Sequence, residues 1–190
     1  MQHKTIGFAF TGSFCTFTPT LEALRRLKQE YATVIPIMSE NAHSLDTRFG
    51  AAEYYIREIE AICGHPIVQT IPDAEPFGPK KTLDLLVIAP CTGNTLAKLA
   101  AGIADSTVSF ACKAHLRNAR PVVLGISTND GLAAAAKNIG ELLNRKHFYF
   151  VPFGQDDPMK KPTSLIADLS KLNDTVAAAF HGEQIQPVLL

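Results

Sequence analysis

Hydrophobic runs of five or six residues recur along the chain, and a helical pattern follows most of them. The clearest run, Leu85–Ala89, has no polar position and therefore indicates a parallel strand buried on both faces. After Pro90 and a short polar turn, apolar residues recur at helical spacing from Leu96 to Ile103. This stretch predicts a strand, a tight turn and the N-terminus of a helix.

The same alternation continues through the rest of the chain. It predicts strands at residues 5–10, 33–38, 67–70, 85–89, 121–126 and 148–151, and helices at 17–30, 47–62, 96–103, 107–118, 133–143 and 164–180. Proline-rich segments at 72–83 and 152–158 are predicted loops. The pattern predicts an α/β fold with one doubly wound, mostly parallel, six-stranded Rossmann-like (flavodoxin-like) sheet that has helices on both faces. Residues 1–190 are expected to form a single domain.

Polar turns at residues 11–16, 39–41, 90–95 and 127–130 follow four of the predicted strands. In doubly wound sheets the carboxyl ends of the strands share one edge, where ligands bind. The first amides of a helix lack internal partners and favour anions or electron-rich carbonyl groups. We therefore expect a ligand at this edge.

The turn at residues 90–95 has two interpretations. Gly93 would let a flat ligand approach the backbone, and Asn94 can donate and accept hydrogen bonds at the edge of a heterocycle. A helix capped by Thr92 or Asn94, with no ligand at all, explains the same residues. Spacing alone leaves both interpretations open.

Composition excludes several classes of partner. Lys plus Arg and Asp plus Glu number 18 each, so no net charge attracts nucleic acid or an anionic membrane. No apolar run approaches the ~20 residues of a membrane helix, and the chain is expected to be soluble and unprocessed. The four scattered cysteines indicate a reducing cytoplasm rather than a zinc site or a disulfide framework; they are Cys15, Cys63, Cys91 and Cys112.

Known catalytic and phosphate-binding motifs are absent from the sequence. Neither a Gly-x-Gly-x-x-Gly nor a Walker pattern occurs, so a mononucleotide phosphate suits the Gly12–Ser13 turn better than a dinucleotide. No nucleophile elbow or His-Glu-x-x-His is present, and Asp156–Asp157 is expected in a turn rather than at a metal. His115 is expected at a helix end or on the surface. No catalytic residue and no metal ligand is assigned.

Residues 90–105 resemble the Pro-x-x-x-Asn-Thr-x-x-Lys-x-Ala-x-Gly-x-x-Asp signature of the flavoprotein superfamily, the homo-oligomeric flavin-containing cysteine decarboxylases. The turn Thr11-Gly12-Ser13 matches the first flavin-phosphate turn of that superfamily. Within it, the chain resembles the family of dipicolinate synthase B subunits of spore-forming bacteria. The most specific segments are residues 36–42, 114–118, 126–131 and 151–158.

The resemblance implies flavin mononucleotide (FMN) as cofactor and a homo-oligomer built from trimers. It also implies that the chain works with the A subunit of dipicolinate synthase, which carries NADP, to oxidise dihydrodipicolinate to dipicolinate in the mother-cell cytoplasm during sporulation. Candidate cations for this dicarboxylate substrate are Arg48, Lys80, Lys81, Lys160 and Lys161. The implied cofactor site comprises Thr11, Gly12, Ser13, Ser39, Pro90, Thr92, Gly93, Asn94, Thr95, Ser127, Thr128 and Asn129.

The chain departs from the decarboxylases of this superfamily in two places. They carry a His-Ile-x-Leu segment before the central strand and a cysteine late in the chain, whereas this chain has Gln69–Pro72 and no cysteine after Cys112. Decarboxylation of a cysteinyl substrate is therefore not expected. Two alternatives to the oxidation stay open: a flavin-dependent decarboxylase of the parent family, and a non-catalytic assembly partner of the A subunit.

Overall fold

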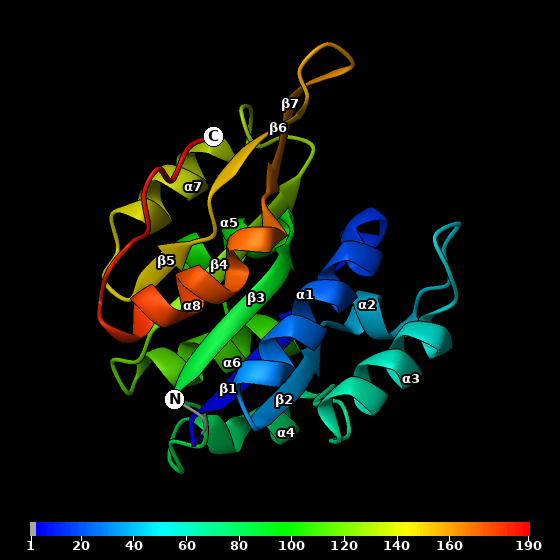
Figure 1. Cartoon of the computed structure of the whole chain (residues 1–190), viewed down its shortest axis with the longest axis vertical. Coiled ribbons are helices and arrows are strands. Elements are labelled where there is room, and N and C mark those ends of the chain that lie inside the picture. The colour runs from blue at the N-terminus through cyan, green and yellow to red at the C-terminus, as the bar shows by residue number, and fades with distance from the viewer. Residues whose placement is uncertain (1–2) are drawn as a thin grey trace.

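A computed structural model describes residues 3–190, with helices covering both faces of a central sheet (Figure 1). The sheet has seven strands in the order β2-β1-β3-β4-β7-β6, and β5 pairs with another part of β4. The predicted α/β class and mostly parallel sheet are confirmed. Residues 1–2, which the predicted domain includes, lie outside the described residues.

Five parallel strands form the body of the sheet. The central strand β3 is buried at all seven positions; the apolar run predicts the first five, and the strand continues through Pro90 to Cys91, past its predicted end at Ala89. The chain passes from β1 to β2 on one side and then to β3 on the other side of β1, so the strand order reverses between β1 and β3. The bounds are β1 (Thr5–Phe10), β2 (Thr33–Met38), β3 (Leu85–Cys91), β4 (Val122–Thr128) and β5 (Phe148–Phe150).

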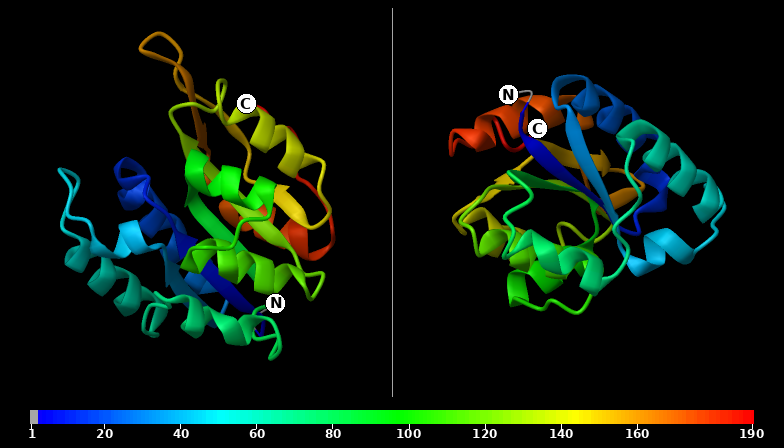
Figure 2. Two further views of the ribbon diagram at one scale, coloured as in Figure 1. Left: turned by 180° about the vertical axis from the view of Figure 1, so that it is seen from behind. Right: turned by 90° about the horizontal axis from the view of Figure 1, so that it is seen from below.

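Helices pack on the two faces of this sheet. Helices α1 and α8 contact each other on one face (Figure 1), and α5, α6 and α7 lie together on the other, as the view from behind shows (Figure 2). The α-helices are α1 (Phe17–Glu30), α2 (Glu40–Ser44), α3 (Ala52–Cys63), α4 (Ile71–Ala74), α5 (Gly93–Ala101), α6 (Thr107–Leu116), α7 (Ala136–Leu143) and α8 (Leu172–Phe180). Short 3₁₀ helices are η1 (Phe14–Thr16), η2 (Glu75–Phe77) and η3 (Leu169–Lys171).

The structure has seven strands rather than the predicted six, because one predicted strand is not formed and two strands that were not predicted are present. The strand expected at residues 67–70 is reduced to one isolated bridge between Ile37 and Val68. Residues 152–170, expected as a loop and the start of a helix, instead form an antiparallel hairpin of β6 (Phe153–Asp157) and β7 (Lys161–Ala167). Strand β7 also pairs antiparallel with the end of β4, through Ser127–Ile166 and Thr128–Leu165.

Other boundaries also differ from the predictions. Helix α3 begins at Ala52 rather than near residue 47, because Thr47 and Gly50 exchange backbone hydrogen bonds in a turn; Asp46 still accepts the Ala52 amide at 2.9 Å. The loop expected at 72–83 contains η2 and most of α4, whose first turn is capped by Thr70. His115, expected at a helix end or on the surface, lies at the end of α6 but is fully buried.

An aromatic cluster fixes the start of α1 beside the end of β1. The rings of Phe10 and Phe17 lie 5.6 Å apart, and Phe17 meets Tyr55 of α3 edge to face at 4.9 Å. The first polar turn is therefore held between two packed elements. Within residues 3–190, no helix is both long enough and apolar enough to cross a membrane.

Candidate functional site

Two adjoining hollows lie at the carboxyl ends of the parallel strands. The first hollow encloses about 440 Å³ and the second about 530 Å³, both within the ~300–1,000 Å³ typical of small-molecule sites. They share Gly12, Thr92 and Asn94 and therefore form one continuous depression. The depression lies where the strand order reverses between β1 and β3, as expected for this sheet topology.

The polar turns predicted from the sequence converge at these hollows. Eleven of the twelve predicted site residues line them; Pro90 lies beside them and accepts the Thr11 hydroxyl at its carbonyl, 2.7 Å away. The first hollow is lined by Gly12, Ser13, Thr92, Gly93, Asn94, Ser127, Thr128 and Asn129. The second is lined by Thr11, Gly12, Ser39, Thr92, Asn94 and Thr95. Their role in holding a cofactor stays a prediction.

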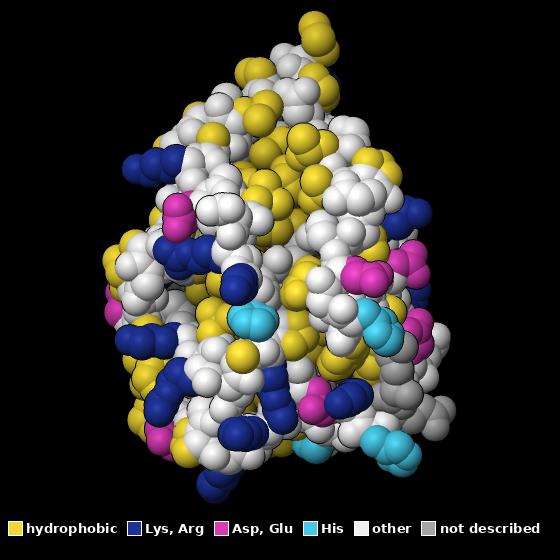
Figure 3. All heavy atoms as spheres, turned by 90° about the vertical axis from the view of Figure 1, so that its left-hand side faces the viewer, with side chains coloured by type: hydrophobic (Ala, Val, Ile, Leu, Met, Phe, Trp, Pro, Cys, Tyr) yellow, Lys and Arg dark blue, Asp and Glu magenta, His cyan; other side chains and the backbone are white. Residues whose placement is uncertain are grey.

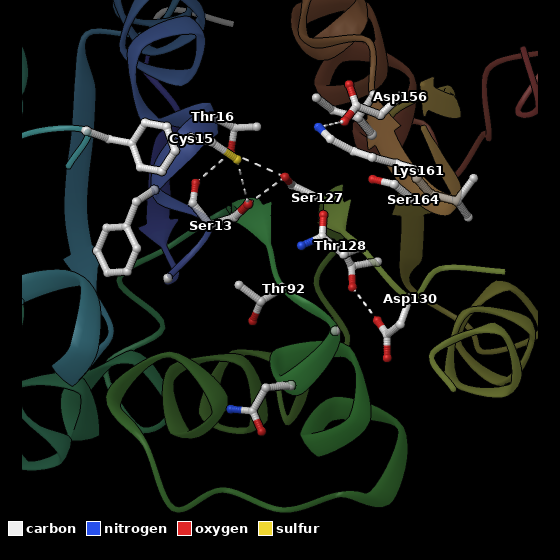
Figure 4. A pocket seen from close by; sticks show the side chains of 18 residues that line it. Ser13, Cys15, Thr16, Thr92, Ser127, Thr128, Asp130, Asp156, Lys161 and Ser164 are labelled. Carbon is white, nitrogen blue, oxygen red and sulfur yellow. Dashed lines mark hydrogen bonds and ion pairs between the residues drawn. The ribbon is translucent and has the colours of Figure 1, made fainter. Parts of the chain in front are cut away.

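Hydroxyl groups join the first turn to the end of β4. The Ser13 and Ser127 hydroxyls lie 2.6 Å apart, and Thr16 donates to the Ser13 carbonyl at 2.7 Å and to the Ser127 hydroxyl at 3.3 Å (Figure 4). Ser13 and Thr16, the N-cap positions of η1 and α1, make no side-chain capping bond. The Thr16 amide donates to the Ser13 carbonyl at 3.1 Å and the Phe17 amide to the Phe14 carbonyl, so the amides available to an anion are those of Phe14 and Cys15.

The turn before α5 is built differently. Thr92 caps the helix by accepting the Thr95 amide at 3.2 Å, and Thr11 accepts the Thr92 amide at 3.1 Å. Thr92 therefore takes the capping role predicted for it. Asn94 is exposed at the rim of both hollows, and its carboxamide has no hydrogen-bond partner in the described part of the chain. That carboxamide is free to meet a ligand.

Position 93 has room only for glycine, because Thr128 at the end of β4 and Asp130 in the following turn lie very close to it. A β-carbon at position 93 would lie 2.7 Å from Asp130 Oδ1 and 2.7 Å from the Thr128 hydroxyl, which donates to Asp130 at 2.5 Å. A larger residue would therefore push this pair away. The sequence interpretation, in which glycine makes room for a ligand, did not include this close approach of two turns.

The β6–β7 hairpin supplies one wall of the first hollow, which the sequence interpretation missed. Lys161 and Asp156 form an ion pair at 2.6 Å, and Asp156 raises the pKa of Lys161. The wall was missed because this segment was predicted as loop and helix. Further lining residues that were not predicted are Phe14, Cys15, Thr16, Phe49, Asp130, Ser164, Leu165 and Ile166.

The five candidate cations are separated by the fold. Lys161 lines the first hollow, and the Arg48 guanidinium lies over the ring of Phe49, 4.8 Å from its centre, at the same hollow. Lys80 and Lys81 precede β3 and thus lie at the opposite edge of the sheet. Lys160 is exposed in the turn of the hairpin. Of the five candidates, Lys161 lines the first hollow and Arg48 adjoins it through Phe49, whereas the other three lie away from it.

The second hollow is mostly polar and contains two ordered carboxylates. Lys98 binds Asp105 at 2.7 Å, and this hydrogen bond lowers the pKa of Asp105. Glu40 accepts the amide and hydroxyl of Thr107 at 2.8 and 2.9 Å. Lys98 and Asp105 were quoted as part of the family signature but not predicted as site residues. The other lining residues that were missed are Glu40, Asn41 and Ser106.

The first departure from the decarboxylases, Gln69–Pro72, falls at an ordinary structural position. The Gln69 carbonyl accepts the Thr107 hydroxyl at 2.8 Å, and Thr70 caps α4. Burial raises the pKa of the Cys63 and Cys112 thiols to about 12, so they are protonated and unreactive at neutral pH.

Comparisons with known proteins agree with this architecture. Residues 1–179 match the Flavoprotein family. The B subunit of dipicolinate synthase from Bacillus subtilis (strain 168) is 45% identical over 190 residues, which are 100% of this chain and 95% of that protein. The crystal structure of the dipicolinate synthase B subunit from Bacillus halodurans C has a TM-score of 0.90 at 46% identity, covering 98% of this chain and 96% of that one. The FMN-dependent cysteine decarboxylase SpaF shares the fold, with a TM-score of 0.71 at 22% identity and coverage of 94% and 98%. The chain therefore belongs to the flavoprotein family, in which it is similar along its whole length to the B subunits of dipicolinate synthase.

Proposed function

We propose that this protein binds FMN in the two hollows and, with the separate A subunit of dipicolinate synthase, oxidises dihydrodipicolinate to dipicolinate. The observation that carries the proposal is the convergence of uncapped helix amides, hydroxyls and the free Asn94 carboxamide at one sheet edge. The 45% identity over the full chain to a B subunit of dipicolinate synthase supports the choice of reaction.

The residues of the hollows fit the parts of FMN. The phosphate suits the free amides at the start of η1, beside the hydroxyl of Ser13. The flavin ring needs apolar contact and a carboxamide at its edge, which Phe14, Phe49 and Asn94 offer in the first hollow. When bound, a flavin supplies two-electron redox chemistry, and the protein contributes position and electrostatics.

The oxidation removes two electrons and two protons from the dihydropyridine ring, which becomes aromatic. They leave as one hydride, taken up by an oxidised flavin or by NADP on the A subunit, and one proton. The substrate carries two carboxylates, whereas this chain has no net charge, so local cations must hold it. Lys161 and Arg48 fill this role in the proposal because both adjoin the first hollow.

We also propose a homo-oligomer built from trimers, working in the mother-cell cytoplasm. Three large apolar side chains are 43–53% exposed near the start of α3; they are Leu45, Phe49 and Tyr54. Hydrophobic side chains also gather in the upper half of a second face (Figure 3), and the C-terminal Leu189 and Leu190 are 65% and 64% exposed. Clustered apolar surface of this kind marks protein interfaces and supports assembly.

Titration of the purified protein with FMN in a calorimeter tests the cofactor. We expect stoichiometric binding that Asn94→Ala weakens by about 1–3 kcal/mol, the cost of leaving a polar group of the ligand unpaired. Asn144→Ala, at the exposed C-terminal end of α7, is the matched control and should bind FMN normally. Absence of binding below millimolar FMN would refute the cofactor.

The reaction is tested by adding the A subunit together with dihydrodipicolinate and following dipicolinate by its ultraviolet absorbance. Asn94→Ala should slow the reaction in proportion to the loss of bound flavin. An unchanged rate with flavin lost would make this chain an assembly partner and assign the redox step to the A subunit. Release of carbon dioxide from phosphopantothenoylcysteine would instead indicate a decarboxylase, which the missing histidine and late cysteine argue against.

A further inference from the structure

Asp130 is a carboxylate of the first hollow without a cation beside it. The hollow also contains Asp156, but Lys161 neutralises that carboxylate at 2.6 Å. Asp130 accepts the Thr128 hydroxyl at 2.5 Å, and no ion pair to it occurs within residues 3–190. The negative charge of Asp130 is therefore not balanced by a neighbouring side chain.

The position of this carboxylate is fixed by its surroundings. Oδ1 lies close enough to the Gly93 backbone that a β-carbon there would be 2.7 Å away. The next residue, Gly131, packs against Leu165 of β7 so closely that a β-carbon would meet it at 2.6 Å. Figure 4 shows Asp130 turned toward Thr128 at the edge of the hollow. The carboxylate is thus held at the start of α5, next to Asn94.

We propose that Asp130 accepts the proton that leaves the substrate ring, an inference that rests on the proposed function. In this step a bond between the ring and hydrogen breaks, its proton bonds to the Asp130 carboxylate, and its electrons stay in the ring as it becomes aromatic. A second hydrogen leaves with its electron pair as hydride to the oxidised flavin or nicotinamide. The Asp130 carboxylic acid then returns its proton to water.

The two aspartates of the first hollow differ in their partners, and this difference favours Asp130 as the base. Asp156 is bonded to Lys161 at 2.6 Å, whereas the only side-chain partner of Asp130 within residues 3–190 is the Thr128 hydroxyl, so one carboxylate oxygen of Asp130 can accept a proton. A plain alternative is that Asp130 only joins the β4 turn to α5 through Thr128 and the close contact with Gly93.

Asp130→Asn separates the two roles. The amide oxygen still accepts the Thr128 hydroxyl, so the turn keeps its hydrogen bond while the base is lost. Removing a general base typically costs roughly 100-fold or more in rate, so Asp130→Asn should slow the reaction by about that factor. Calorimetry with dipicolinate should show several-fold tighter binding, because the repulsion between two anions is removed.

Two controls complete the experiment. Thr128→Val breaks the hydrogen bond but keeps the carboxylate, so it should lose much less rate than Asp130→Asn; Asp174→Asn removes an exposed carboxylate of α8 and should behave as wild type. An Asp130→Asn rate and dipicolinate affinity equal to those of an active wild type would overturn this inference alone. Wild-type protein that makes no dipicolinate in the presence of the A subunit would overturn the proposed function and this inference together.

Discussion

His115 makes a testable link between burial and the acid stability of this protein. The side chain is fully buried at the end of α6, with Nε2 3.0 Å from the Pro121 carbonyl, and Nδ1 has no partner in the described chain. Burial, helped by the charge of nearby Arg120, lowers the pKa of His115 from 6.5 to about 4. The hydrogen bond to Pro121 and the charge of Asp84 oppose this shift but are outweighed.

The sign of the effect follows from where the proton binds. Below pH 6.5 the unfolded chain takes up a proton at His115, whereas the folded chain does so only near pH 4. The contribution of His115 to the free energy of unfolding is therefore full above pH 6.5 and falls as the pH is lowered toward 4. At about 1.4 kcal/mol per pKa unit, the difference between 6.5 and about 4 corresponds to about 3.5 kcal/mol, of which about 3 kcal/mol is lost between pH 7 and 4.

Replacing His115 by leucine tests this reasoning. The Pro121 carbonyl keeps a partner, because it also accepts the Leu86 amide at 3.1 Å. The free energy of unfolding of both proteins is measured in urea between pH 7 and 4. The carboxylates affect both proteins equally, so their contribution drops out of the difference. The free energy of unfolding of the variant should therefore rise by about 3 kcal/mol relative to that of wild type over this range. His181→Gln, at an exposed helix end, should show no such trend. A difference between wild type and His115→Leu that does not change with pH would refute the buried neutral imidazole.

Three further predictions concern the site and the assembly. Gly93→Ala should displace Thr128 and Asp130 and destabilise the protein by about 1–3 kcal/mol in urea unfolding, whereas Gly140→Ala, whose β-carbon meets nothing within 4 Å, should be neutral or stabilising. Ser127→Ala removes a hydroxyl bonded to Ser13 and should weaken FMN by about 1 kcal/mol in calorimetry; unchanged affinity would place the phosphate elsewhere. Light scattering at micromolar concentration should give a multiple of the chain mass, and a value of 20.6 kDa would contradict the trimer-based assembly.

The features that the sequence predicts best are those with a local cause. Five of the seven buried positions of β3 follow from an apolar run, and the cap at Thr92 follows from a threonine that precedes a helix. The convergence of the turns at 11–13, 92–95 and 127–129 could be predicted because parallel strands share one edge for their carboxyl ends.

The features that the sequence does not predict depend on tertiary contacts. Residues 161–167 form β7 because they pair with β6 and with the end of β4, a partner more than 30 residues away. Local patterns cannot separate a short apolar strand from a helix in such a segment. The sequence places the turn that contains Asp130 at the ligand edge, but the contact of Asp130 with Gly93 appears only when this turn lies against the start of α5.

The pairing of β7 with β4 has a mechanical consequence. Ser127 and Thr128, which carry hydroxyls of the first hollow, are the same residues that bond the base of the hairpin. The base of the hairpin therefore cannot move without displacing Ser127 and Thr128 in the first hollow. The outer part of the hairpin, beyond the register shift between Gln155 and Asp157, does not pair with β4. Residues added at the tip, around the 91% exposed Met159, would lengthen the wall and leave the floor in place. The length of the β6–β7 hairpin can thus change without moving Ser127 and Thr128, which lets the same site be fitted to substrates of different size.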